Sequence, residues 1–170
     1  MADSSNYKVP FARRRKQKTD YDQRLDLVKS GKPRAVVRLS NNHTRVHLSV
    51  FDQKGDRNKA QTISRELEEH GWDEHTGNLP AAYLTGYLAG MKTDIEEAIL
   101  DKGLRPLNKG GRIFAAVQGL RDAGVDIAVG EEVIPEESRI RGEHIEEMKD
   151  SDITETFEEV KENIEGEING

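Results

Sequence analysis

Hydrophobic and polar positions alternate over residues 44–51, and this alternation predicts a β-strand. Two strands are expected at residues 34–40 and 44–51, because the turn-prone residues 41–43 separate them. Within the second strand, apolar side chains at every second position fall on one face and polar ones on the other. We therefore expect a half-buried antiparallel hairpin, followed by a third short strand at residues 60–64.

Apolar residues recur at intervals of three and four in several other segments, which is the spacing of one helix face. A short helix should begin after an N-cap at Thr19, with Asp22 three residues further on, and end near Gly31. The clearest core helix spans residues 79–93, with Asn78 as its cap. Further helices are expected at residues 112–123, 139–149 and 152–164.

Short apolar segments at residues 98–100 and 125–129 predict two more strands that alternate with these helices. Alternation of strands and helices is typical of an α/β layer structure. The chain is expected to divide into a basic arm with its helix at residues 1–33, an α/β core at 34–130, and an acidic helical extension at 131–170.

Charge is distributed very unevenly along the chain. The formal net charge is -6, but residues 1–45 carry 12 Lys and Arg against 4 Asp, a local charge of +8. Residues 130–170 carry 4 Lys and Arg against 15 Asp and Glu, a local charge of -11. This asymmetry predicts a polyanionic partner at the basic end and a different environment for the acidic end.

Several classes of protein are disfavoured by the composition. The chain has no cysteine, which excludes disulfides, thiolate zinc sites and thiol nucleophiles. No apolar run approaches the ~20 residues that cross a bilayer, and the N-terminal charges are not followed by the apolar stretch of a secretory signal. We expect a soluble intracellular protein with no membrane partner.

The segment from Lys8 to Arg45 carries the strongest functional signal, because Lys and Arg can neutralise the phosphates of a nucleic acid. Residues 7–18 have too many like charges to pack together and should be disordered until RNA is bound. We expect Val36 to face the core, with Arg34 and Arg38 on the opposite face. A solvated charge run or a localisation signal would show a similar composition.

The candidate RNA-binding residues are the basic, aromatic and polar side chains of this segment: Tyr7, Lys8, Arg13, Arg14, Arg15, Lys16, Lys18, Tyr21, Arg24, Lys32, Arg34, Arg38, Ser40, Asn41, Asn42, His43, Arg45 and His47. The side chains of residues 40–43 can donate and accept hydrogen bonds, so they suit the 2′-hydroxyls and unpaired base edges of structured RNA. Turn formation alone would account for the same residues.

Metal and catalytic motifs are absent from the sequence. The five histidines do not have the spacing of a known zinc site, so we expect no metal, no cofactor and no catalytic residues. The loop at residues 108–112 resembles an anion-binding loop only loosely, since it lacks the Lys-Ser or Lys-Thr pair of a phosphate loop. A flexible turn before a helix is the favoured interpretation.

Two alternatives belong to other classes of protein. A metal-dependent nuclease needs carboxylates that converge on two metals, but the predicted strands are short of acids, and Asp101 lies just past one of them. The second alternative is an acidic partner-binding module centred on the last helix, which truncation can distinguish from an RNA-binding protein. Deletion of the residues after Asp150 would remove such a module, whereas RNA binding through the basic segment should largely be retained.

Longer motifs resemble a known family, the large-subunit ribosomal proteins numbered eighteen, in their archaeal and eukaryotic form. The similar stretches lie in one order along nearly the whole chain, at residues 12–15, 19–25, 27–34, 38–43, 71–72, 76–86, 111–116, 122–127 and 141–145. A match of this extent is much more specific than any single motif. The acidic tail after Lys149 is poorly matched.

This resemblance implies both a fold and a function. The fold would be a three-layer α/β/α core with a mixed sheet, a basic N-terminal arm and a helical acidic extension. The protein would be a non-enzymatic constituent of the cytoplasmic ribosome that binds 5S rRNA through the arm and the hairpin. Its other partners would be the large-subunit rRNA and neighbouring ribosomal proteins, including the other 5S-binding protein, in the central protuberance.

Overall fold

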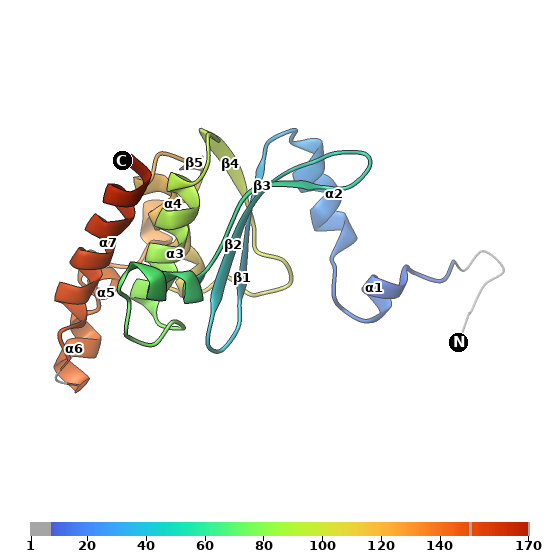
Figure 1. Cartoon of the computed structure of the whole chain (residues 1–170). Coiled ribbons are helices and arrows are strands. Elements are labelled where there is room, and N and C mark those ends of the chain that lie inside the picture. The colour runs from blue at the N-terminus through green and yellow to red at the C-terminus, as the bar shows by residue number, and fades with distance from the viewer. Residues whose placement is uncertain (1–7, 150, 170) are drawn as a thin grey trace.

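A five-stranded sheet lies at the centre of the computed structural model, which describes residues 8–149 and 151–169 (Figure 1). Its strands are β1 (Arg34–Leu39), β2 (Thr44–Val50), β3 (Arg57–Ile63), β4 (Glu97–Asp101) and β5 (Asp126–Ile127). The helices are α1 (Ala12–Arg15), α2 (Tyr21–Lys29), α3 (Leu79–Met91), α4 (Arg112–Asp122), α5 (Glu137–Arg141), α6 (Glu143–Lys149) and α7 (Ile153–Asn169). Two short 3-10 helices are η1 (Ser64–His70) and η2 (Glu131–Val133).

The sheet is mixed, with the strand order β3-β2-β1-β4-β5. Short turns join β1 to β2 and β2 to β3, so both pairs are antiparallel and form the expected meander. β4 and β5 are parallel to their neighbours, and a parallel pair needs a longer crossover. α3 lies between β3 and β4 in the chain, and α4 lies between β4 and β5. The predicted α/β class with a mixed sheet is confirmed.

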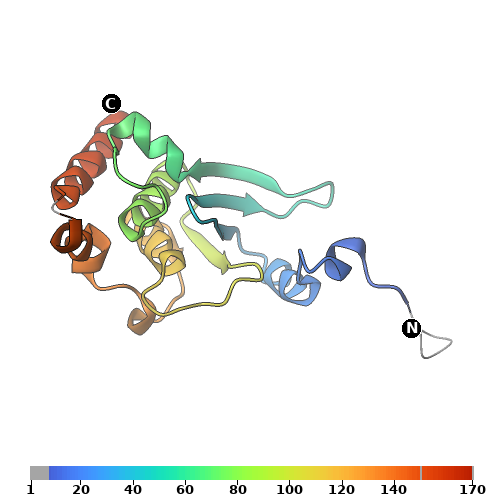
Figure 2. The same cartoon turned by 90° about the horizontal axis from the view of Figure 1, so that it is seen from below.

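α3 and α4 cover one face of the sheet and pack closely on each other (Figure 2). Twelve consecutive residues of α3, Leu79 to Gly90, are buried, which explains why this helix is apolar all round. A Cβ at Gly86 would overlap the carbonyl of Ala116, and one at Gly119 would overlap the carbonyl of Tyr83. The two backbones can therefore approach this closely only because both crossing positions are glycines.

The strand pairing confirms most of the predicted faces. Val46 and Leu48 of β2 are fully buried against the helices, as the alternation predicts. The expectation for Val36 was wrong. Residues two apart share a face, so Val36 lies with Arg34 and Arg38, and it is Ala35 and Val37 that are fully buried in the core. β3 begins three residues before the predicted strand.

The face of the sheet away from α3 and α4 is bordered by α2, which forms a small third layer (Figure 1). None of the residues of α2 is buried. Its N-cap is Asp20, not Thr19 as expected, because the Asp20 carboxylate accepts hydrogen bonds from the backbone N–H groups of Asp22 and Gln23. Thr19 instead accepts a hydrogen bond from the Arg13 side chain at 2.9 Å.

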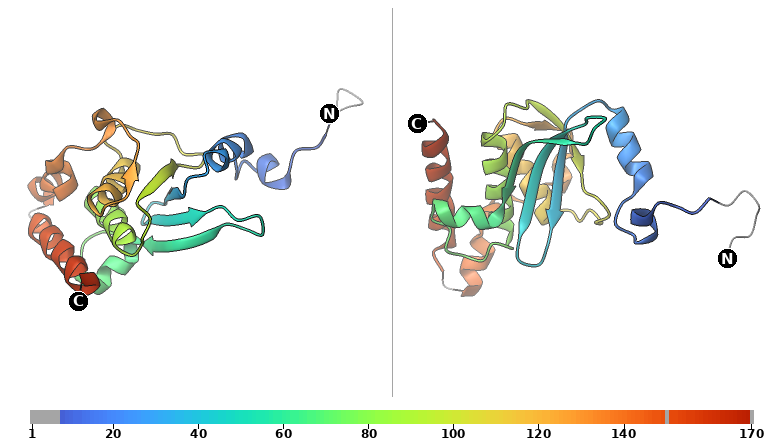
Figure 3. Two further views of the ribbon diagram at one scale, coloured as in Figure 1. Left: turned by 90° about the horizontal axis from the view of Figure 1, so that it is seen from above. Right: turned by 45° about the vertical axis from the view of Figure 1, so that its right-hand side comes forward.

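The C-terminal helices form a further layer on the outer side of α3, at the opposite end of the molecule from α1 (Figure 3). The predicted helix at residues 139–149 is divided at Gly142, whose φ of 93° ends α5 before α6 begins. The apolar stripe of α7, which includes Phe157 at 3% exposure, packs into one core cluster with Trp72 and Tyr83. The acidic extension is therefore attached to the core along this stripe. Among the described residues, no helix is long and apolar enough to cross a membrane.

Candidate RNA interface

The face of the sheet away from α3 and α4 holds an ion-pair network around Asp101, at the end of β4. The Arg38 Nη2 atom donates to Asp101 Oδ1 at 2.7 Å, and its Nη1 atom donates to the Asp101 backbone oxygen at 2.6 Å. The second carboxylate oxygen accepts from Arg34 Nη1 at 2.9 Å. Asp56 pairs with Arg34 and, at 2.8 Å, with Arg24 of α2. This network joins β1, β4, the β2–β3 loop and α2.

Arg34 and Arg38 differ in how far they reach the surface. The Arg34 side chain is only 4% exposed and is neutralised by two carboxylates, so it anchors the sheet to its surroundings. The Arg38 side chain is 42% exposed and keeps contact with solvent. Of the two arginines predicted on this face, Arg38 is therefore the one whose guanidinium a nucleic acid can reach in this conformation.

The ionised form of Asp101 is favoured despite its burial. Desolvation by burial acts to raise the pKa of this carboxyl, but hydrogen bonds and positive charge from Arg38, the Gly103 N–H and the charge of Arg34 outweigh it. The net effect lowers the pKa of Asp101 from its ordinary value. A buried carboxylate with several charge-assisted donors stays charged and holds its partners in place.

The tip of the β1–β2 hairpin is supported from below by the segment that precedes α3. The Thr76 hydroxyl donates to the Asn42 carbonyl at 2.7 Å and lies 3.1 Å from His43 Nδ1. The His43 N–H donates to Ser40 Oγ at 2.9 Å, which closes the turn. Asn41 and Asn42 are exposed. The tip is therefore a fixed turn that presents two amide side chains to solvent.

Arg45 and His47 lie on the same face of β2 beyond this tip. Arg45 is exposed, whereas His47 is half-buried. Desolvation lowers the pKa of His47, a hydrogen bond with Gln61 opposes this shift, and the charges of Arg45 and Arg38 add to it. The net shift is downward from 6.5, so His47 is neutral at physiological pH and acts there as a hydrogen-bonding group.

The arm precedes α2 and projects away from the body of the protein (Figure 1). Every described residue of the predicted arm set is exposed: Lys8, Arg13, Arg14, Arg15, Lys16 and Lys18. Tyr7 lies outside the described residues. Residues 12–15 form the single turn of α1, and the Phe11 and Tyr21 rings lie 5.2 Å apart. That the arm becomes ordered only on RNA binding stays a prediction.

Two of the predicted cations near the arm already have acidic partners. Arg14 lies 3.4 Å from Asp22, and Lys32 pairs with Glu97. All four side chains are about half exposed or more, so these pairs cost little to open. Arg14 and Lys32 can therefore exchange their acidic partners for phosphates.

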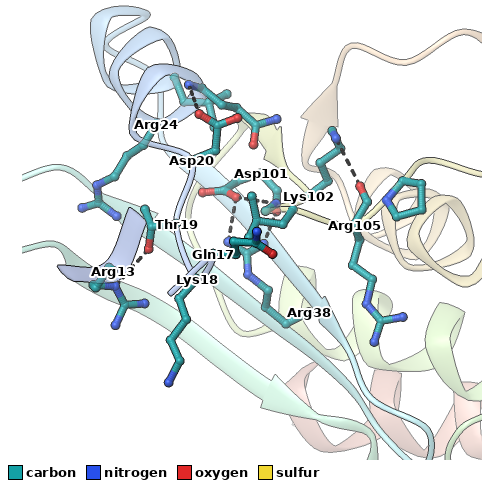
Figure 4. Close-up of a pocket in the computed structure, with 15 residues that line it drawn as sticks. Arg13, Gln17, Lys18, Thr19, Asp20, Arg24, Arg38, Asp101, Lys102 and Arg105 are labelled. Atoms are coloured by element: carbon teal, nitrogen blue, oxygen red, sulfur yellow. Dashed lines mark hydrogen bonds and ion pairs between the residues drawn. The ribbon is translucent and has the colours of Figure 1, made fainter. Parts of the chain in front are cut away.

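Sequence reasoning missed the basic residues of the loop after β4. Lys102 and Arg105 lie near Arg38 (Figure 4). The Arg105 Nη2 atom donates to the Leu39 carbonyl at 3.0 Å. Together with the arm and α2 they surround a hollow of about 580 Å³. A local signal was present, because residues 102–112 contain four Lys and Arg and no acid. What joins this loop to the arm is the pairing of β4 with β1, which is a tertiary contact.

No group of three or more His, Asp or Glu side chains within the described residues could hold a metal ion. Asp101, which a nuclease would need as a metal ligand, is instead held between Arg34 and Arg38. Among the parts of the chain that the structure describes, the basic surface is thus the feature with a clear chemical capacity. It can bind phosphates along the arm and present polar groups at the hairpin tip.

Comparisons with known proteins give the following similarities. A model of the family described as "Ribosomal large subunit proteins 60S L5, and 50S L18" matches residues 5–96. The Large ribosomal subunit protein uL18 of Korarchaeum cryptofilum is 53% identical over 148 residues, which are 85% of this chain and 76% of that protein. The proteins of the same name from Halorubrum lacusprofundi and Haloquadratum walsbyi are 51% and 50% identical, again over 85% of this chain and over 80% and 72% of their own lengths.

Proposed function

Since the chain belongs to the family of ribosomal large subunit proteins 60S L5 and 50S L18, we propose that it binds 5S rRNA and helps attach it to the large rRNA in the central protuberance. The observation that carries this proposal is the continuity of the basic surface. The arm lies on the side of the sheet away from α3 and α4 (Figure 3). Arg38, whose side chain is 42% exposed, meets the arm at one hollow, and the hairpin tip begins two residues further along the chain. A flexible cationic arm beside a fixed turn can wrap a folded RNA and respond to its shape.

The two parts of this surface have different tasks in the proposal. The residues from Tyr7 to Lys18 neutralise phosphates, which supplies affinity without sequence preference. Asn41 and Asn42 at the hairpin tip contact 2′-hydroxyls or unpaired base edges, which supplies selectivity for folded RNA. Arg34 contributes indirectly, because it anchors the network that fixes Arg38.

The proposal includes a division of the chain into three functional parts. Residues 1–33 and the hairpin bind 5S rRNA, while residues 34–130 form the α/β scaffold. Residues 131–170, which carry most of the acidic charge, face neighbouring proteins such as the other 5S-binding protein rather than RNA. We propose that the protein is not an enzyme and acts on the cytoplasmic ribosome. The alternatives of a nuclease or of an independent acidic module have no support in the family relationship.

A salt titration with transcribed 5S rRNA tests this proposal. Log Kobs should fall steeply with log salt for the unchanged protein. Replacement of Arg13, Arg14 and Arg15 by Gln should flatten that slope by about 2–3, because each lost phosphate contact removes about 0.7–0.9 from the slope. A matched control replaces three exposed cations far from the arm, namely Arg65, Arg139 and Lys149, by Gln.

The control variant has the same net charge as the arm variant, so it should keep the slope of the unchanged protein. Equal flattening in both variants would show that net charge alone matters and that the arm is not the contact. Absence of 5S rRNA binding by the unchanged protein, or binding that does not respond to salt, would reject the proposal as a whole.

A further inference from the structure

The hollow beside Arg38 is formed by segments that are far apart in the chain. Its volume is about 580 Å³, within the range of cavities that hold small ligands. It is bounded by the end of the arm, by α2, by β1 and by the loop after β4 (Figure 4). The basic side chains that line it are Arg13, Lys18, Arg24, Arg38, Lys102 and Arg105.

The charge of this hollow is strongly unbalanced. Six basic residues line it against two acidic ones, Asp20 and Asp101, a formal charge of +4. Both carboxylates already have partners in the protein, because Asp20 caps α2 and Asp101 lies between two arginines. Within the described residues, four lining cations have no carboxylate within ion-pair distance: Arg13, Lys18, Lys102 and Arg105. An anion that enters the hollow therefore finds cations that are not already neutralised.

Arg38 is held in a fixed orientation at the wall of the hollow. Two of its N–H groups donate to the Val37 and Asp101 carbonyls, and a third donates to the Asp101 carboxylate. A Cβ at Gly103 would lie 3.0–3.3 Å from three atoms of the guanidinium group, so this glycine lets the loop pack against it. An arginine has five N–H groups, so two of them remain for a ligand.

The hollow also has apolar walls. Leu27 of α2 and Leu104 and Pro106 of the loop line it, and Leu104 is 51% exposed. The ends of Arg13, Lys18 and Arg105 point to the same side of it (Figure 4). Cations on one side and apolar groups beside them suit a ligand that has both a phosphate and a ring with apolar faces.

We propose that this hollow takes one unpaired nucleotide of the bound RNA, with its phosphate among Arg13, Lys18 and Arg105 and its base against Leu104 and Pro106. The inference rests on the proposed function and adds a position at which a single nucleotide is read. Arg38, oriented by Asp101, supplies its two remaining N–H groups to that nucleotide. Unpaired bases leave the stack at low cost, which is why RNA-binding proteins select them.

Nucleotide-resolution chemical probing of 5S rRNA in the complex tests the inference. The lining variant replaces Lys102 and Arg105 by Gln. The matched control replaces Lys109 and Arg65, which are exposed and do not line the hollow. The unchanged protein and the control should protect an unpaired nucleotide that becomes reactive again with the lining variant. At equal salt, the lining variant should bind about tenfold more weakly, while the rest of the protected region persists.

A second measurement uses RNA in which the protected nucleotide is made abasic. That change should weaken binding by the unchanged protein and have much less effect on the lining variant, because both changes release the same nucleotide from the hollow. Equal losses of affinity in both proteins would overturn the inference. So would a lining variant that still protects the nucleotide, or one that loses protection over the whole RNA. In all of these outcomes the unchanged protein still binds 5S rRNA, whereas its failure to bind would reject the proposed function and this site together.

Discussion

Arg38 and Asp101 are 63 positions apart in the sequence, yet the guanidinium of one donates twice to the other, at 2.6 and 2.7 Å. Parallel pairing of β1 with β4 places Asp101 directly beside Val36, on the strand that carries Arg38. The other Asp101 oxygen accepts from Arg34, so one carboxylate fixes two arginines. The network therefore links the stability of the sheet to the geometry of the basic surface.

Substitution of Asp101 should destabilise the protein strongly. Asp101→Asn leaves the Arg34 guanidinium, whose side chain is 4% exposed, with one carboxylate in place of two. Loss of one partner of a buried ion pair typically costs about 3–5 kcal/mol. Urea denaturation measures the free energy of unfolding. Asp22→Asn is the control, because the Asp22 side chain is 79% exposed and its pair with Arg14 contributes little. Similar losses in both variants would contradict this role for Asp101.

The contribution of Asp101 should also depend on pH. Its pKa is lowered on folding, so the unfolded chain binds the proton more readily and acid destabilises the folded state. The stabilisation is fully present above the ordinary carboxyl pKa of 3.8 and is lost as the pH falls through the lower folded value. The difference in unfolding free energy between the unchanged protein and Asp101→Asn should shrink below pH 3.8. A difference that is constant from neutral pH to pH 2 would contradict this.

Substitutions of the adjacent residues Asn42 and His43 should have different effects, one on RNA selectivity and the other on stability. His43→Ala removes the contact with Thr76 under the hairpin tip and should lower stability by about 1 kcal/mol. Asn42→Ala removes an exposed side chain and should leave the melting temperature unchanged. Its effect should appear as a smaller preference for folded over denatured 5S rRNA, with the same salt slope. An Asn42 variant with unchanged preference would exclude its side chain from recognition.

The crossing of α3 and α4 should not tolerate a methyl group. Gly86→Ala directs its Cβ into the Ala116 carbonyl, so the helices must separate, at a cost of about 1–3 kcal/mol or more. Gly166→Ala in α7 is the matched control. A Cβ there meets nothing within 4 Å, and alanine should stabilise the helix by about 0.4–1 kcal/mol. Thermal unfolding should show a lower melting temperature for Gly86→Ala and a higher one for Gly166→Ala. An unchanged melting temperature for Gly86→Ala would show that the helices can move apart freely.

α7 should contribute to the stability of the whole fold. Phe157→Ala removes a ring that is 3% exposed and packs with its centroid 5.4 Å from that of Tyr83, so a loss of about 3–5 kcal/mol is expected. Glu155→Ala, on the exposed side of the same helix, should change stability by less than about 0.5 kcal/mol. Deletion of the residues after Asp150 should likewise lower the melting temperature. Retention of RNA binding after that deletion stays a prediction, to be measured below the melting temperature of the truncated protein.

Local sequence patterns predicted most of the secondary structure. The period-two alternation of β2 and the capped apolar segment of α3 were recognised within a few residues of their ends. The errors came where local signals compete. Either of two neighbouring side chains, Thr19 or Asp20, could cap α2, and in the structure Asp20 does so. The glycine that divides the helix at residues 139–149 has a left-handed φ that the apolar spacing alone does not reveal.

The candidate site was predictable only in part. The run of cations in the arm is a compositional feature, so it is visible without a structure. The burial of Arg34 is not, because it depends on Asp56 and Asp101, which reach it from the β2–β3 loop and from β4. Lys102 and Arg105 were missed for the same reason.

The sequence by itself determined the α/β class, the basic and acidic ends and the family relationship, because periodicity, charge and motifs are properties of short segments. Only the tertiary structure decided which cations remain free to bind RNA. Pairing of β1 with β4 brings one buried carboxylate to two arginines and a basic loop to the arm. A cation is neutralised by whichever acid the fold places within a few ångströms, and that acid is rarely its neighbour in the chain.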